Sequence, residues 1–263
     1  MAFSLVRPMP LDAGEEMVSD AEIMAEALAF ARRNRQRIAR ERTDRERFSP
    51  EEHPVSIFMA GSPGAGKTEI SKEYVAALDE LREEGVDGLG NILRIDPDDL
   101  REELPGYTGD NSWLFQRAVS ILVERIHDLM LKQRQSFILD GTLASLDVAR
   151  KNIERSLNKD RDVQIFFVYQ HPSLAWQFVR GREEVEGRNI PLDTFIRQFL
   201  DVQDVVRRIK QEYGDRVILD MIVKNNDGTS QLWETDIDSI DAYLPERYTR
   251  EQLDSLLVGE DGA

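Results

Sequence analysis

The chain has 263 residues, a length that allows one or two domains with a substantial buried core. Its formal net charge of −16 argues against a general affinity for nucleic acid or for an anionic membrane surface. Because it contains no cysteine, disulfides and thiolate metal sites are excluded.

Composition and hydropathy together favour a soluble, cytoplasmic protein. Three histidines, at positions 53, 127 and 171, lie far apart in the chain, and we expect each of them to be structural. No apolar run is long enough to span a bilayer, and residues 1–12 lack the basic-then-apolar order of a secretory signal. We therefore expect no membrane partner.

An arginine-rich helix is predicted near the N-terminus. After an irregular lead over residues 1–18, Ser19 offers an N-cap for a helix whose apolar residues recur at helical spacing up to Ile38. From Arg32 to Arg47 the sequence has eight arginines and three acidic residues. Such a run could contact an acidic partner, nucleic acid or the acidic body of this chain, but the alternation of arginine with acid favours a solvated helix face.

A phosphate-binding motif follows the first predicted strand. The P-loop pattern G-x-x-x-x-G-K-[ST] is matched by Gly61, Ser62, Pro63, Gly64, Ala65, Gly66, Lys67 and Thr68. Residues 55–60 precede it as an apolar strand, and residues 69–78 follow it with apolar side chains at helical spacing. In this context the backbone N–H groups and the helix N-terminus would surround a phosphate. Lys67 would reach the β- and γ-phosphates, and the Thr68 hydroxyl would ligate Mg²⁺. A plain glycine-rich turn is the alternative.

Strands and helices alternate along the rest of the chain. Four more apolar strands are predicted at residues 91–95, 136–139, 163–169 and 217–223, with residues 231–233 as a candidate hairpin partner. Helices are predicted over residues 113–131, 146–157, 173–184 and 191–213, and a terminal helical appendage over residues 236–258. This order is typical of a parallel sheet covered on both faces. We therefore predict an α/β P-loop kinase fold with a five-stranded, mostly parallel sheet over residues 55–263, preceded by an N-terminal helical extension over residues 1–54.

Three polar segments come directly after predicted strands. They are the P-loop, the run Asp96-Pro97-Asp98-Asp99 and the run Asp140-Gly141-Thr142. Ligands of such sheets bind at the carboxyl ends of the strands, so we expect all three segments to meet in one crevice.

A small-molecule kinase fits these features better than other P-loop classes. Residues 224–227 (K-N-N-D) resemble the guanine motif of GTPases only superficially, and motor or transport ATPases usually need a longer chain. A kinase needs a phosphate cradle, a metal, a base and cations over the transferred phosphoryl group. Asp98 is placed to act as the base, although Asp96, Asp98 or Asp99 could instead cap the next helix. Asp140 is placed to hold Mg²⁺, with a plain strand-end acid as the alternative.

Three arginines gather around a predicted helix end, Arg180, Arg182 and Arg188. Lid arginines of kinases occupy such a place, where they neutralise phosphate charge and help to exclude water. For each of them a surface ion pair is the alternative.

The order of four motifs resembles the zeta-toxin family of bacterial P-loop kinases. They are G-S-P-G-A-G-K-T at residues 61–68, R-I-D-P-D-D-L at 94–100, S-F-I-L-D-G-T at 136–142 and R-E-E-V-E-G-R-N-I-P at 182–191. The resemblance runs from about residue 57 to residue 226. It implies ATP-dependent phosphorylation of UDP-N-acetylglucosamine on the 3′ hydroxyl of the amino sugar, by a toxin that an antitoxin protein holds inactive.

The resemblance also implies catalytic roles. Lys67 would bind ATP (or GTP), and Asp98 matches the catalytic base of the family. Arg182 and Arg188 match two phosphate-clamping arginines, with Arg180 as a substitute for Arg182.

The metal and acceptor sides are implied in the same way. Thr68 would bind Mg²⁺ with Asp140, which stands where zeta toxins have a glutamate and is one methylene shorter. Glu124 and Thr142 match residues that bind the substrate in this family, and Asp98 belongs to the same set. The shorter acid could alter the choice of acceptor.

Other functions stay open at the level of the sequence. A P-loop kinase of this kind could phosphorylate another hydroxyl, on a nucleoside, a dinucleotide or an antibiotic. A nucleotide-binding regulatory module that uses the basic N-terminal helix is a further alternative. We also hypothesise that residues 20–47 pack on the kinase body and act as a built-in regulator.

Overall fold

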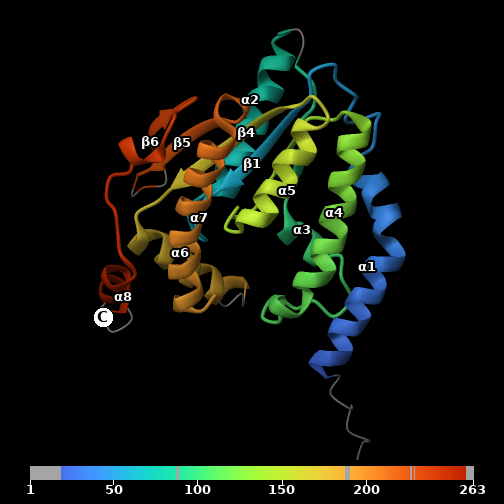
Figure 1. Cartoon of the computed structure of the whole chain (residues 1–263). Helices are drawn as coiled ribbons and strands as arrows, with labels where there is room; N and C mark the ends of the chain where they lie inside the picture. Colours follow the sequence, from blue (N-terminus) through green and yellow to red (C-terminus); the bar gives the residue numbers. More distant parts are fainter. Residues whose placement is uncertain (1–18, 87–88, 187–189, 226, 228, 259–263) are drawn as a thin grey trace, which may run out of the picture.

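A six-stranded sheet forms the centre of the computed structural model, which describes residues 19–86, 89–186, 190–225, 227 and 229–258 (Figure 1). The strands lie in the order β2-β3-β1-β4-β5-β6. Their bounds are Val55–Ala60 (β1), Leu93–Ile95 (β2), Phe137–Leu139 (β3), Asp162–Tyr169 (β4), Ile218–Lys224 (β5) and Ser230–Glu234 (β6).

Five of these strands run parallel, which confirms the predicted core of the sheet. The sixth strand, β6, pairs antiparallel with β5 as the suggested hairpin partner. At the turn between them the N–H of Asn225 donates to the carbonyl of Thr229 at 2.6 Å.

Helices cover the sheet on both sides. Their bounds are Asp20–Arg42 (α1), Lys67–Glu83 (α2), Pro97–Arg101 (α3), Gln116–Gln133 (α4), Leu146–Leu157 (α5), Pro172–Glu186 (α6), Leu192–Tyr213 (α7) and Arg250–Val258 (α8). Three short 3₁₀ turns add Ser112–Phe115 (η1), Gly214–Arg216 (η2) and Ile240–Ala242 (η3). None of the described helices has the length and apolar character that crossing a membrane would require.

The helical appendage predicted over residues 236–258 is wrong in its extent. Residues 240–242 form only η3, and the helix α8 starts at Arg250. Pro245 lies between them, and because proline lacks a backbone N–H and fixes φ, it interrupts a continuous helix.

The central strand β1 is buried on both faces. Phe58 belongs to the larger core, which includes residues of α1, α4 and α7. Ile57 and Met59 point the other way, into a smaller core with Ile70 of α2. Successive side chains of a strand point to opposite faces of the sheet, and those of β1 are mostly apolar on both faces. The sheet therefore packs against helices on both sides.

The arginine-rich helix α1 packs against α4, as we hypothesised for residues 20–47. Ser19 caps it in a reciprocal capping box with Glu22. The buried face of α1 carries Ala27, Ala31 and Ile38, none more than 1% exposed. The predicted lead over residues 1–18 lies outside the described part of the chain.

Candidate active site

The P-loop joins β1 to α2, as the sequence predicts. Gly64 has a φ of 72°, and a Cβ there would lie 2.1 Å from the carbonyl oxygen of Ala175 in α6. Only glycine therefore lets the loop and α6 approach so closely. Gly66 also has a positive φ, 89°, directly before α2 begins at Lys67. The end of the loop is thus a helix N-terminus, which attracts phosphate.

The Lys67 side chain folds back over the loop. Its Nζ donates to the carbonyl oxygens of Gly61 at 3.0 Å and Ser62 at 2.7 Å. The carbonyl of Thr142 accepts the N–H of Gly61 at 3.3 Å, which joins the segment after β3 to the same loop. An ammonium in this position can exchange loop carbonyls for phosphate oxygens, which form stronger, charge-assisted bonds.

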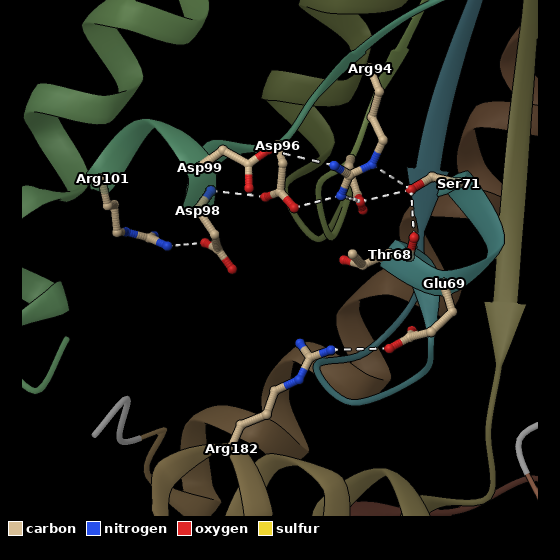
Figure 2. A network of polar contacts seen from close by, with 10 residues as sticks. Thr68, Glu69, Ser71, Arg94, Asp96, Asp98, Asp99, Arg101 and Arg182 are labelled. Atoms are coloured by element: carbon tan, nitrogen blue, oxygen red, sulfur yellow. Dashed lines mark hydrogen bonds and ion pairs between the residues drawn. The ribbon is translucent and has the colours of Figure 1, made fainter. Parts of the chain in front are cut away.

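A largely buried arginine connects the carboxylates that follow β2 and β3 (Figure 2). The Nη2 of Arg94 lies 2.6 Å from a carboxylate oxygen of Asp96 and 2.6 Å from one of Asp140. Its Nε donates to the hydroxyl of Ser71 in α2 at 2.8 Å. Ser71 in turn donates to Asp140 at 3.0 Å. One cation therefore ties both strand ends to the helix that starts at the P-loop.

Burial and charge oppose each other within this network. Burial raises the pKa of Asp96, against the hydrogen bond from the N–H of Asp98, which lowers it. Burial alone would lower the pKa of Arg94, but the Asp140 and Asp96 carboxylates outweigh it and raise that pKa. Arg94 therefore stays charged as the counter-ion of the cluster.

Asp98 projects from the first turn of α3. The helix cap is Asp96, whose carboxylate accepts the N–H of Asp98 at 2.8 Å, so capping does not occupy the Asp98 carboxylate. Asp98 forms an ion pair with Arg101, which is buried and also donates to the side-chain oxygen of Gln116 at 3.0 Å. The side chain of Asp98 is 44% exposed, so an acceptor molecule can reach it.

Arg182 approaches the P-loop from the other side (Figure 2). It extends from α6 toward α2, and its Nη2 lies 3.3 Å from a carboxylate oxygen of Glu69. Arg182 also lines a pocket of ≈ 500 Å³ together with Gly64, Gly66 and Phe178. In Figure 2, Asp98 lies to the left of Thr68, and Arg182 lies below it. Cations and carboxylates therefore face one phosphate-binding loop from two directions.

Comparison with known proteins decides the family. The family model described as zeta toxin matches residues 38–238. The chain belongs to the zeta toxin family. Both the recognition of this family and the P-loop kinase fold predicted from the sequence are thereby confirmed.

One curated relative shares part of the sequence of this zeta toxin family member. Toxin PezT of Streptococcus pneumoniae serotype 4 is 27% identical over 130 residues, or 47% of either chain, so the match spans about half the length of that curated relative.

Solved structures share the fold. A chain from the PezAT chromosomal toxin–antitoxin system of S. pneumoniae has a TM-score of 0.61 and 20% identity, over 91% of this chain and 96% of that one. A chain of AvrRxo1-ORF1:-ORF2 with ATP has a TM-score of 0.56 and 15% identity, over 85% and 71%.

The remaining predicted residues differ in where the zeta toxin fold places them. The guanidinium of Arg180 lies 6.0 Å from the centre of the Trp176 ring, and that of Arg182 lies beside Glu69 of the P-loop helix. Glu124 lies exposed on α4 and pairs with Lys151 of α5 at 2.7 Å, and its substrate role stays a prediction. Arg188 lies outside the described residues.

The residues at the site fit one Mg²⁺ bound together with a nucleotide. Mg²⁺ in kinases takes one or two protein oxygens, and phosphate oxygens and waters complete its shell. Thr68 supplies a hydroxyl in the first turn of α2. One oxygen of Asp140 already accepts from Ser71 and Arg94, which leaves its other oxygen for the ion or for a metal-bound water. Among the described residues no group of three or more His, Asp or Glu could hold a metal by itself.

Sequence reasoning missed four polar residues of the site. Arg94 lies in the middle of β2 and Lys224 at the end of β5, both among mostly apolar residues, and that contrast is a signal that could have identified them. Arg101 follows Asp98 by three residues, the spacing of ion pairs on one helix face. Ser71 carries no comparable signal.

Proposed function

We propose that this zeta toxin family member is an ATP-dependent kinase that phosphorylates a hydroxyl group of a small molecule. The observation that carries the proposal is the placement of Asp98 and Arg182 around Thr68, the last residue of the P-loop motif (Figure 2). Lys67 and Arg182 would neutralise the charge of the transferred phosphoryl group. Asp98 would take the proton of the acceptor hydroxyl as the new O–P bond forms. Thr68 and Asp140 would hold Mg²⁺, which offsets further phosphate charge.

For the acceptor we propose UDP-N-acetylglucosamine, at the 3′ hydroxyl of its amino sugar. The support is the match of four motifs between residues 61 and 191 to those of the family. Asp140 departs from the glutamate expected there, and this difference is a reason to test nucleosides, dinucleotides and antibiotics as well. Glu124 and Thr142 would contact the acceptor.

We further propose that the protein acts as the toxin of a toxin–antitoxin pair. The support is the likeness to a chain of the PezAT toxin–antitoxin system. Helix α1 contacts the elements near Asp98, where the acceptor would bind. One example is the pair between Arg42 and Glu103, just after α3. These contacts support a structural role for α1, so we favour a separate antitoxin over self-inhibition by this helix.

Mass spectrometry tests the proposal directly. The full chain is incubated with ATP, Mg²⁺ and a mixture of candidate acceptors, and we expect one acceptor, UDP-N-acetylglucosamine, to become heavier by one phosphoryl group. The matched control is the Asp98→Asn variant, which should form no product. If ATP binds but no acceptor is phosphorylated, the kinase proposal is wrong and a nucleotide-binding regulatory role is favoured.

A further inference from the structure

A buried lysine at the end of β5 has no role in the proposed phosphotransfer. Lys224 is 8% exposed and lines the same pocket as Gly64, Gly66 and Arg182. Its Cε lies 3.4 Å from the position that a Cβ on Gly66 would occupy. The strand therefore holds this ammonium group directly beside the P-loop.

Lys224 differs from the other buried cations in its partners. Lys210 is equally buried, but its ammonium donates to the carbonyl of Val217 at 3.1 Å and lies 3.8 Å from Asp236. Arg101 is buried and ion-paired as well. For Lys224 there is no hydrogen bond or ion pair within the described part of the chain, and the Asp227 carboxylate, which lines the same pocket, acts on it only at longer range. Removing a charge from water is unfavourable unless a partner compensates it, so an anion is expected to supply the missing interaction.

The pocket around Lys224 has the character of a nucleobase site. Phe178 and Val185 of α6 supply apolar surface, and Gln170 and Gln177 supply amide groups that can read a polar edge. The P-loop forms one end of this pocket through Gly64, Ala65 and Gly66. A nucleotide with its base in the pocket and its terminal phosphates on Lys67 places its α-phosphate between the two, next to Gly66.

We propose that Lys224 binds the α-phosphate of the donor nucleotide. This inference rests on the proposed function, because it takes a nucleotide at the P-loop as given. The α-phosphate is not transferred, so its contact with Lys224 is the same in the ground state and in the transition state. Such uniform binding affects nucleotide affinity and leaves the rate of the bound complex unchanged.

Nucleotide titrations with the full chain test this assignment. Lys224→Met keeps most of the aliphatic stem and removes the charge. We expect it to weaken the binding of AMP, of ADP and of ATP by about tenfold or more each, because all three carry an α-phosphate. Lys67→Met should instead weaken ADP and ATP and spare AMP, since Lys67 reaches the β- and γ-phosphates. Lys224→Arg should restore most of the affinity, because it returns a positive charge to the end of β5.

Three results would overturn the assignment. Unchanged affinity for all three nucleotides excludes any contact with Lys224. A loss of affinity that is confined to ATP would indicate a contact with the γ-phosphate. A loss of affinity that differs between ATP, GTP and CTP would indicate a contact with the base. A wild-type chain that binds none of these nucleotides contradicts the proposed function itself, and this outcome is distinct from the other three.

Thermal unfolding supplies an independent measurement. Because Lys224→Met removes a buried charge that has no hydrogen-bonded partner within the described residues, the nucleotide-free variant should unfold at the same or a higher temperature than the wild type. The rise in unfolding temperature on adding ATP should be smaller than in the wild type. A nucleotide-free variant that is clearly less stable, or does not fold, would show that Lys224 is satisfied within the protein and would refute the inference.

Discussion

Two neighbouring carboxylates on α3 have different surroundings, and their comparison tests the catalytic base. Asp98 is paired with the buried Arg101, whereas Asp99 is more exposed and lies 3.6 Å from Arg94. We expect Asp98→Asn to reduce phosphoryl transfer by about 100-fold or more, because an amide cannot accept the proton. Binding of ATP should stay nearly unchanged.

The measurement is single-turnover transfer together with a titration of ATP. Asp99→Asn is the matched control and should retain transfer within about twofold, since an exposed acid on the same turn takes no part in the chemistry. Normal turnover of Asp98→Asn would disprove its role as the base.

The counter-ion Arg94 gives a second prediction at the level of single residues. Arg94→Met removes the cation that pairs with Asp140, whose side chain is only 3% exposed. Removing one partner of such a pair is strongly destabilising, and we expect the free energy of unfolding to fall by about 3 kcal/mol. Urea denaturation at pH 7 measures the change.

A surface pair serves as the control for this variant. Arg37 pairs with Glu41 on α1, with both side chains more than half exposed. Arg37→Met should therefore lower the free energy of unfolding by less than about 1 kcal/mol. Equal effects of the two substitutions would mean that the Arg94 network does not stabilise the fold.

At the level of elements, the contact between α4 and the sheet contains a buried histidine. His127 lies edge-on to Phe58 and Phe137, with ring centroids 6.3 and 5.0 Å away. Burial, assisted by the positive charge of Arg155, lowers the pKa of His127 to about 3. Below about pH 6.5 the unfolded chain protonates this histidine, whereas the folded chain keeps it neutral down to about pH 3. The free energy of unfolding must therefore fall as the pH decreases from about 6.5 toward 3.

His127→Leu should remove that dependence. Between pH 6.5 and pH 5 the wild type should lose about 2 kcal/mol of unfolding free energy through this residue, and the variant should not lose that share. Urea denaturation at both pH values compares them. His53→Gln, which changes an exposed histidine, is the control and should keep the full dependence. The same slope in all three proteins would contradict a neutral, buried His127.

The order of the elements was predictable because apolar periodicity is local, whereas the partners of polar side chains depend on register. Arg94 lies opposite Ile138 in the pairing of β2 with β3, and this register brings it beside Asp140. No local pattern specifies that pairing. The position of Arg182 beside Glu69 likewise depends on how closely α6 packs on the P-loop. Convergence of strand ends could be predicted, but the network among them could not.

The whole molecule has two flanks around the P-loop. Figure 1 shows α6 at the left of the view and α4 with α1 at the right. The α6 flank carries Arg182 and the pocket beside Lys224, which we assign to the donor nucleotide. The α1 flank supports α3, since Arg42 pairs with Glu103, and it supports α4, since Arg125 donates to Gln36 at 2.9 Å. Helix α1 is therefore positioned to affect the acceptor side and Asp98 more than nucleotide binding.

Deletion of residues 1–50 tests this division. The truncation exposes the face of α4 that Ala27, Ala31 and Ile38 cover, and we expect the free energy of unfolding to fall by roughly 3 kcal/mol. Transfer to the acceptor should decrease, because α3 loses its support, while ATP affinity is retained. Arg32→Gln combined with Arg33→Gln removes exposed charge and keeps the helix, so it should change neither property. A stable truncation with an unchanged rate would show that α1 is dispensable, and a faster one would assign it the role of a built-in regulator.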